Sequence, residues 1–404
     1  LSSFAEFSFC FKEIFMRKKF HNSYLAHFLL FNFFFLAYSL FSTLISVYMQ
    51  DLGYSNAQVS MVVSASFFAS MLAQPIFGII SDALGIKKIF LFSFLVMMVG
   101  AVFFMKATQL WQLLVWYSLV LMLVNGVNPV MDVLAAQSSY TYGKIRIWGT
   151  IGYALGSQLA GLIYQRVAPQ AIFPAFISMM LISSLGLLGI QPKHDRAALE
   201  SRNTRKQTGL GKLLTNKTYL FYLFLVALYS GVGNTGHTYI PAMLQHSGLE
   251  VDMASTVVAL SVLVEAPFIF YSYLFMDKLS MKKLLYICLG IIFLQYSVYA
   301  LDLGLISKIG MTLLSKHVTG MVLIMVTLKI VASLVDEKYL ITAIALVQTA
   351  RSLGTILIQN LAGHFLDSWG YEGMNLFLAA IICLVCLLAL FLKLPERKGN
   401  QLFG

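Results

Sequence analysis

The stretch QPIFGIISDALGIKKIF, residues 74–90, separates two long apolar runs with only about eight polar residues. It contains Asp82, the glycines Gly78 and Gly85, and the adjacent lysines Lys87 and Lys88. Glycine adopts a positive φ at little cost, and paired lysines stay on the aqueous side of a bilayer. We therefore expect a tight polar hairpin between two membrane-buried segments.

The rest of the chain has the composition of a membrane protein. Of its 404 residues, 59% are hydrophobic and 11% charged, with a mean hydropathy of +0.80. Apolar runs recur at the length that spans a bilayer as a helix, and they do not alternate as barrel strands do. We expect an all-α polytopic membrane protein with twelve transmembrane helices, at 23–49, 56–80, 88–105, 109–134, 146–168, 171–190, 218–245, 254–276, 283–301, 306–333, 338–364 and 372–394.

The net charge of +11 does not indicate a nucleic-acid partner, because the basic residues gather in alternate loops. Of the lysines and arginines, only Lys106, Arg166 and Lys308 lie in the loops on the opposite side. This asymmetry is typical of the positive-inside rule and predicts that both termini are cytoplasmic. Met16 precedes Arg-Lys-Lys, so we expect it to be the natural start and residues 1–15 to be an extension.

The longest polar segment, 191–217, divides the expected helices six and six. We expect a cytoplasmic tail at 1–22, an N-terminal six-helix bundle at 23–190, a cytoplasmic linker at 191–217, a C-terminal six-helix bundle at 218–394 and a second cytoplasmic tail at 395–404.

The hairpin recurs in the second half. MDKLSMKK, residues 276–283, places Asp277, Lys282 and Lys283 where the first copy has Asp82, Lys87 and Lys88, 195 positions earlier. Each copy lies between the second and third expected spans of its half. Two six-span halves with equivalent loops are the parallel repeat of a major facilitator transporter.

The first hairpin resembles the signature loop of the major facilitator superfamily, which latches the two halves together at the cytoplasmic side. The resemblance implies this latch role for eight residues. They are Gly78, Asp82, Gly85, Lys87, Lys88, Asp277, Lys282 and Lys283.

Three further motifs resemble the lactose permease family of oligosaccharide–proton symporters and the related phenylpropionate-permease-like proteins. They are NPVMD at 128–132, YGKIRIWGTIGY at 142–153 and LAGHFLDSWGYEG at 361–373. The resemblance implies that Asp132 and Arg146 bind the solute and that Tyr153 replaces a ring-stacking tryptophan. It aligns Arg351 with a lysine of the permease.

The chain departs from that pattern at its charged positions. His317 matches a span-ten histidine, but Gly320 stands where the family has its proton-carrying glutamate. Span seven offers Asn234 and His237 in place of two aspartates. Glu265 lies about one turn beyond the family's span-eight glutamate.

Ionisable groups inside the spans are candidates for function, because each costs roughly 2.5–3.5 kcal/mol to insert. We expect Glu265 to carry a proton, with Arg351 or His317 as the cation that modulates it, and His317 also to contact the solute. The alternatives are a static Glu265–Arg351 ion pair, a plain Asp132–Arg146 salt bridge and a packing role for His317.

The sequence contains no Walker loop, metal-ligand cluster or nucleophile triad. We therefore expect no enzyme activity, no cofactor and no metal site. We expect a monomeric transporter in a bacterial cytoplasmic membrane, surrounded by lipid, that imports a small polar solute with a proton. A sugar or oligosaccharide is the first choice, and an aromatic acid or nucleoside the second. Proton-driven drug efflux and a non-transporting sensor on the same scaffold are the alternative functions.

Overall fold

The computed structural model describes residues 20–136, 138–140, 142–190, 210–270, 278–336 and 339–394. These residues form helices and no strands. The helices are α2 (Tyr24–Ser42), α3 (Ile45–Asp51), α4 (Asn56–Leu84), α5 (Ile86–Lys106), α6 (Leu110–Ala136), α7 (Tyr142–Arg166), η1 (Pro169–Ala171), α8 (Ile172–Gly189), α10 (Leu210–Thr215), α11 (Lys217–His246), α12 (Val251–Phe270), α13 (Met281–Ala300), α14 (Leu305–Leu334) and α15 (Leu340–Ala389).

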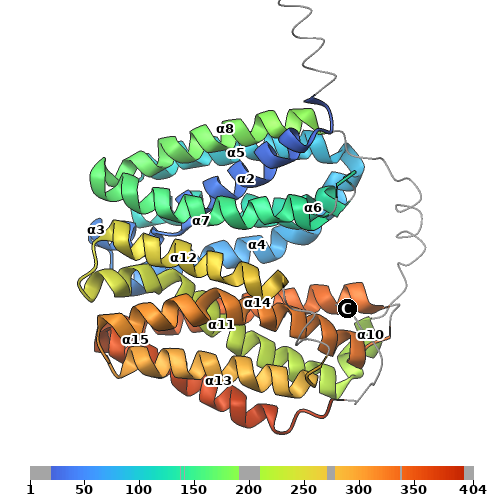
Figure 1. Ribbon diagram of the computed structural model, residues 1–404, viewed down its shortest axis with the longest axis vertical. Helices are drawn as coiled ribbons and strands as arrows, with labels where there is room; N and C mark the ends of the chain where they lie inside the picture. Colours follow the sequence, from blue (N-terminus) through green and yellow to red (C-terminus); the bar gives the residue numbers. More distant parts are fainter. Residues whose placement is uncertain are drawn as a thin grey trace, which may run out of the picture.

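The helices form two bundles, which lie one above the other in Figure 1. In the first bundle α2 packs against α7 and α8, and α4 packs against α6. In the second, α15 packs against α11 and α13, and α14 packs against α12. The bundles meet where α7 lies along α12 and α4 lies along α15. The two-bundle fold expected from the sequence is therefore confirmed.

Among the described residues, nine helices are both long and apolar enough to cross a membrane. One of them, α15, has 50 residues and contains two spans, because Gly370 interrupts it with φ 68° and ψ −170°. Helices α7 and α11 are also long enough, with 25 and 30 residues. They are less apolar because they supply polar side chains to the bundle interface. Counted this way, the described helices supply the twelve spans.

The polar hairpin is shorter than the sequence predicts. Helix α4 continues to Leu84 and α5 begins at Ile86, so Gly85 alone separates them, with φ 88°. The positive φ expected at Gly85 is confirmed, whereas the expected end of the span at residue 80 is wrong. Within the expected linker at 191–217, the structure describes the short helix α10 and the first residue of α11.

The repeated lysines make equivalent contacts in the two bundles. Lys87 Nζ donates to the carbonyl of Leu188 at 2.6 Å, near the end of α8. Lys282 Nζ donates to the carbonyl of Leu390 at 3.2 Å, just after α15. Each lysine thus binds the last helix of its own bundle, which supports the internal repeat. Asp277 and the side chain of Asp82 lie outside the described residues, so the latch between the bundles stays a prediction.

Glycines on α7 set its distance from the neighbouring helices. A Cβ added at Gly152 would collide with the backbone oxygen of Asn32 on α2, and one at Gly156 with that of Leu36. Close approach through small residues is a general means of packing helices in membranes. The α2–α7 contact therefore depends on the absence of side chains at these positions.

We expect Gly152→Ala to lower the thermal unfolding temperature, because the new methyl group meets a backbone atom that cannot rotate away. Gly290→Ala on α13 is the matched control, since a Cβ there would meet nothing within 4 Å. Thermal unfolding of both variants in detergent measures the effect. Equal unfolding temperatures for the two variants would show that α2 and α7 can separate without cost.

Candidate functional site

A cavity of about 370 Å³ lies between the bundles, within the usual size range of small-molecule sites. Helices α2 and α7 line it from the first bundle, and α11 to α15 from the second. Five of the six solute and proton residues expected from the sequence line it together: Arg146, Tyr153, Glu265, His317 and Arg351. They come from four helices, α7, α12, α14 and α15, and meet only in the folded protein.

Asp132 forms an ion pair with Arg146. Its Oδ1 lies 3.0 Å from Arg146 Nε and accepts a hydrogen bond from the Tyr142 hydroxyl at 3.1 Å. The Arg146 guanidinium lies 4.6 Å from the centre of the Phe35 ring. The Asp132 side chain is 44% exposed and is not among the described residues that line the cavity. Arg146 thus lines the cavity while its Nε atom pairs with a carboxylate outside the cavity lining.

Glu265 lies against His317. Its Oε2 is 3.6 Å from His317 Nδ1, and both side chains are mostly buried, at 16% and 17% exposure. Arg146, from the opposite bundle, lines the same cavity as Glu265. Arg351 lines the same cavity but forms no ion pair with a described carboxylate. The alternative of a static Glu265–Arg351 pair is therefore wrong for this conformation.

An aromatic and histidine cluster joins the bundles at the cavity. The Tyr153 hydroxyl on α7 and His237 Nε2 on α11 lie 2.9 Å apart in a hydrogen bond. The His237 and His317 rings lie 5.6 Å apart, nearly perpendicular. Tyr38 packs edge-on against Tyr153 at 5.5 Å. Tyr153 therefore contacts both the cavity and the second bundle.

The sequence interpretation missed Lys316 as a site residue. It lines the cavity, and its buried Nζ makes no hydrogen bond within the described part of the chain. The signal in the sequence was a cation far from either end of its span with no acid three or four residues away. Such a lysine cannot form an ion pair along its own helix.

One end of the bundle interface is closed by hydrogen bonds between the bundles. Asp367 on α15 accepts from the backbone N–H of Asn56 and of Ala57, each at 2.8 Å, and so caps α4 across the interface. Arg166 lies 3.4 Å from Asp252 at the same end. We call this region, where α4 begins and α7 ends, the closed end.

The opposite end of the interface, where α6 ends and α7 begins, differs. Between residues that the structure describes, no hydrogen bond or ion pair joins the bundles there. The exposed Asp132 carboxylate and the 32%-exposed Arg146 side chain lie at this end. Beyond the cavity, the hydrogen bonds and ion pairs that join the bundles in the described part of the chain therefore lie at the closed end.

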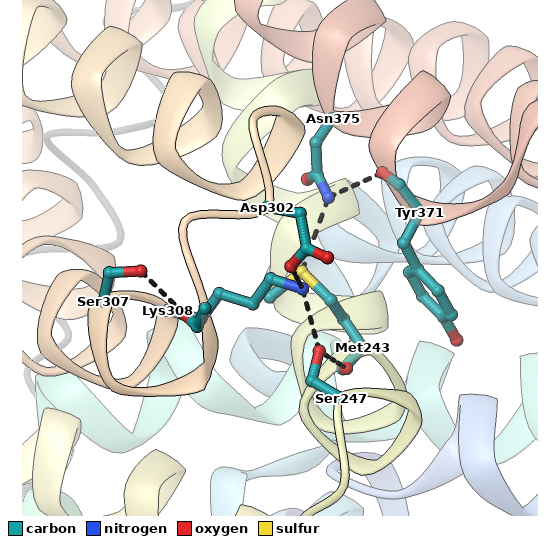
Figure 2. Close-up of polar contacts among 8 residues, drawn as sticks. Met243, Ser247, Asp302, Ser307, Lys308, Tyr371 and Asn375 are labelled. Carbon is teal, nitrogen blue, oxygen red and sulfur yellow. Dashed lines mark hydrogen bonds and ion pairs between the residues drawn. The ribbon is translucent and has the colours of Figure 1, made fainter.

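A second polar network at the closed end lies within the second bundle (Figure 2). Lys308, in the first turn of α14, is 4% exposed and lies 2.7 Å from Asp302 Oδ1. It also donates to Ser247 Oγ at 2.9 Å, while Asn375 donates to the Tyr371 carbonyl at 2.7 Å. Because none of these residues lines the cavity, the network serves the packing of the bundle.

We expect Asp367→Asn to open the closed end more often, because the neutral amide is a weaker cap for the α4 N–H groups. A loss of about 1 kcal/mol corresponds to roughly fivefold in the population of the open form. Spin labels at the exposed Val167 and Leu303, in a background without native cysteines, report the distance between the bundles there.

The control is Asp302→Asn, which removes an ion pair inside one bundle and should leave this distance distribution unchanged. An unchanged distribution in Asp367→Asn would contradict the role of this cap in closing the interface.

Solved structures with a similar fold are transporters. A point mutant of the nucleoside transporter NupG has a TM-score of 0.82 at 16% identity, and the match covers 91% of this chain and 99% of the other. A D-xylose-proton symporter has a TM-score of 0.70 at 14% identity, with coverage of 91% and 96%. These likenesses identify the fold.

Sequence relatives extend over nearly the whole chain. The sucrose permease of Escherichia coli is 22% identical over 391 residues, covering 90% of this chain and 92% of its own. The maltose permease of Geobacillus stearothermophilus is 24% identical over 376 residues, covering 91% and 94%. The sequence model of the MFS_1 like family matches residues 24–350. The two bundles, the interface cavity and this match together show that the chain belongs to the MFS_1 like family.

Proposed function

We propose that this protein is a secondary transporter that moves a sugar or oligosaccharide across a bacterial inner membrane together with a proton. The observation that carries the proposal is the cavity between the bundles, where Arg146 and the Glu265–His317 pair face the same space. The permease relatives favour a sugar, and the family favours transport over catalysis.

Alternating access follows from the arrangement of the two bundles. The cavity is closed by contacts such as Asp367 with α4 at one end and lacks described contacts at the other. Rocking of the bundles about the central site would exchange the open and closed ends. With the positive-inside assignment, both termini are cytoplasmic and this conformation faces inward.

The cavity residues have distinct proposed roles. Arg146 binds solute hydroxyls with its planar guanidinium group, and Asp132 fixes the orientation of that group. Tyr153 offers an aromatic face and a hydroxyl. Glu265 binds and releases the proton, because a water-poor cavity favours the neutral, protonated form of a carboxyl group over its charged form. Arg351 supplies a nearby positive charge, and His317 Nδ1 lies 3.6 Å from the Glu265 carboxyl group as its polar partner.

The charged cavity separates this proposal from drug efflux, which favours a broad apolar pocket for varied apolar compounds. We further propose that the protein acts as a monomer in the lipid bilayer, since each chain contains both halves of the cavity. A non-transporting sensor would bind solute without moving it.

Uptake into proteoliposomes tests the proposal. The purified protein is given labelled sucrose, maltose and galactose, with and without an inward pH gradient. We expect saturable uptake of at least one sugar-class solute, accumulation only with the gradient, and exchange of loaded solute without it. Saturable binding with neither uptake nor exchange would show a sensor and refute transport.

A further inference from the structure

The charges around the cavity do not balance. Asp132 offsets Arg146 at 3.0 Å, and Glu265 is the remaining carboxylate, facing His317 at 3.6 Å. Lys316 and Arg351 line the cavity as well, and neither forms an ion pair with a described carboxylate. With the histidines neutral, three cations and two carboxylates are found at the cavity among the described residues, so one positive charge has no counter-charge there.

Lys316 is the group with the least compensation. Its buried Nζ has no hydrogen-bond acceptor among the residues that the structure describes. His237 and His317 line the same cavity, and the Nε2 atom of His317 is also buried without a partner in the described part of the chain. An ammonium group without a partner in a low-dielectric site is costly, and the cost is removed when an anion binds.

The structure also leaves room for an anion beside Lys316. Gly320 lies one turn further along α14 and lines the same cavity. A Cβ added at Gly320 would meet nothing within 4 Å, and the same holds for Gly233 on α11 across the cavity. The open space therefore extends over the helix face that carries the lysine.

We propose that the transported solute is a hydroxylated organic acid of sugar size, such as a uronic acid, whose carboxylate binds Lys316 and whose hydroxyls bind Arg146. This inference rests on the proposed function and narrows its substrate to the acidic members of the sugar class. The buried His317 Nε2 atom, which has no partner among the described residues, belongs to the same cavity lining and is available as a second polar contact. Transport of a monovalent anion with one proton moves no net charge across the membrane, whereas transport of a neutral sugar with one proton moves one positive charge.

Matched pairs of solutes test the inference in proteoliposomes: D-galacturonate against D-galactose, and D-glucuronate against D-glucose. We expect the acid of each pair to enter at least about tenfold faster, since a buried charge pair is strongly selective. We expect uptake of the acid to produce no current in electrophysiology on a solid-supported membrane. Lys316→Gln should lower the ratio of acid to neutral uptake at least about tenfold.

A second pair of variants keeps the test independent of whether Lys316→Gln folds. Gly320→Glu places a carboxylate four residues from Lys316, where it can pair with the lysine in place of the solute. Gly320→Gln has the same size without the charge. We expect a lower acid-to-neutral uptake ratio in Gly320→Glu than in Gly320→Gln.

The outcomes separate the two proposals. Uptake of galactose, glucose, sucrose or maltose with no preference for the uronates would overturn the inference and leave sugar transport standing. Equal ratios in the two Gly320 variants would also overturn it. Absence of saturable uptake of any of these solutes would refute the proposed function, and the inference would fail with it.

Discussion

Glu265→Gln is expected to abolish accumulation of the transported solute against a gradient while preserving exchange across the membrane. Glutamine has the size and hydrogen-bonding groups of a protonated glutamate but cannot release a proton. Glu265 is mostly buried, lies 3.6 Å from His317 and shares the cavity with Arg146. A variant held in the protonated form can carry solute both ways, but a pH gradient cannot drive it.

The measurements are gradient-driven uptake and equilibrium exchange in the same proteoliposomes. Glu250→Gln provides the control, because it makes the same substitution at an exposed position just before α12. Accumulation that survives in Glu265→Gln would remove this residue from proton coupling and point to His317 or to another ion.

Arg146→Lys is expected to weaken solute binding at least about tenfold, which is about 1.4 kcal/mol. Lysine keeps the charge but loses the planar fork, so it cannot contact Asp132, the Phe35 ring and a solute at the same time. Titration of the transported solute into detergent-solubilised protein measures the dissociation constant.

The control for this variant is Arg166→Lys, on the same helix at the closed end, where the arginine side chain is 71% exposed. Solute binding by Arg146→Lys that equals the wild type would reduce the Asp132–Arg146 pair to a structural salt bridge.

The sequence predicted the fold because helix length and apolar runs report directly on membrane spans. It also predicted the positive φ at Gly85, since few other residues take that conformation. It failed at the boundaries: residues 81–84 continue α4 because nothing in them breaks a helix before the glycine. The same limit applies to α10, a short helix within a segment expected to be a linker.

The site was only partly predictable for a different reason. Spacing brought Asp132 close to Arg146, but only the packing of α6 on α7 decides which of them faces the cavity. Lys316 was overlooked because its significance depends on the lack of a tertiary partner among the described residues, which the sequence cannot report. The contact of Tyr153 with His237 likewise joins residues 84 positions apart in different bundles.

In the proposed mechanism, solute and proton move together through the cavity that Arg146 and Glu265 line. Solute-induced pH change in lightly buffered, de-energised vesicles tests it most directly. Adding the transported solute outside wild-type vesicles is predicted to make the external medium more alkaline as protons enter with it, and Glu265→Gln vesicles should show no such change. Solute entry into wild-type vesicles with no change in external pH would contradict proton symport.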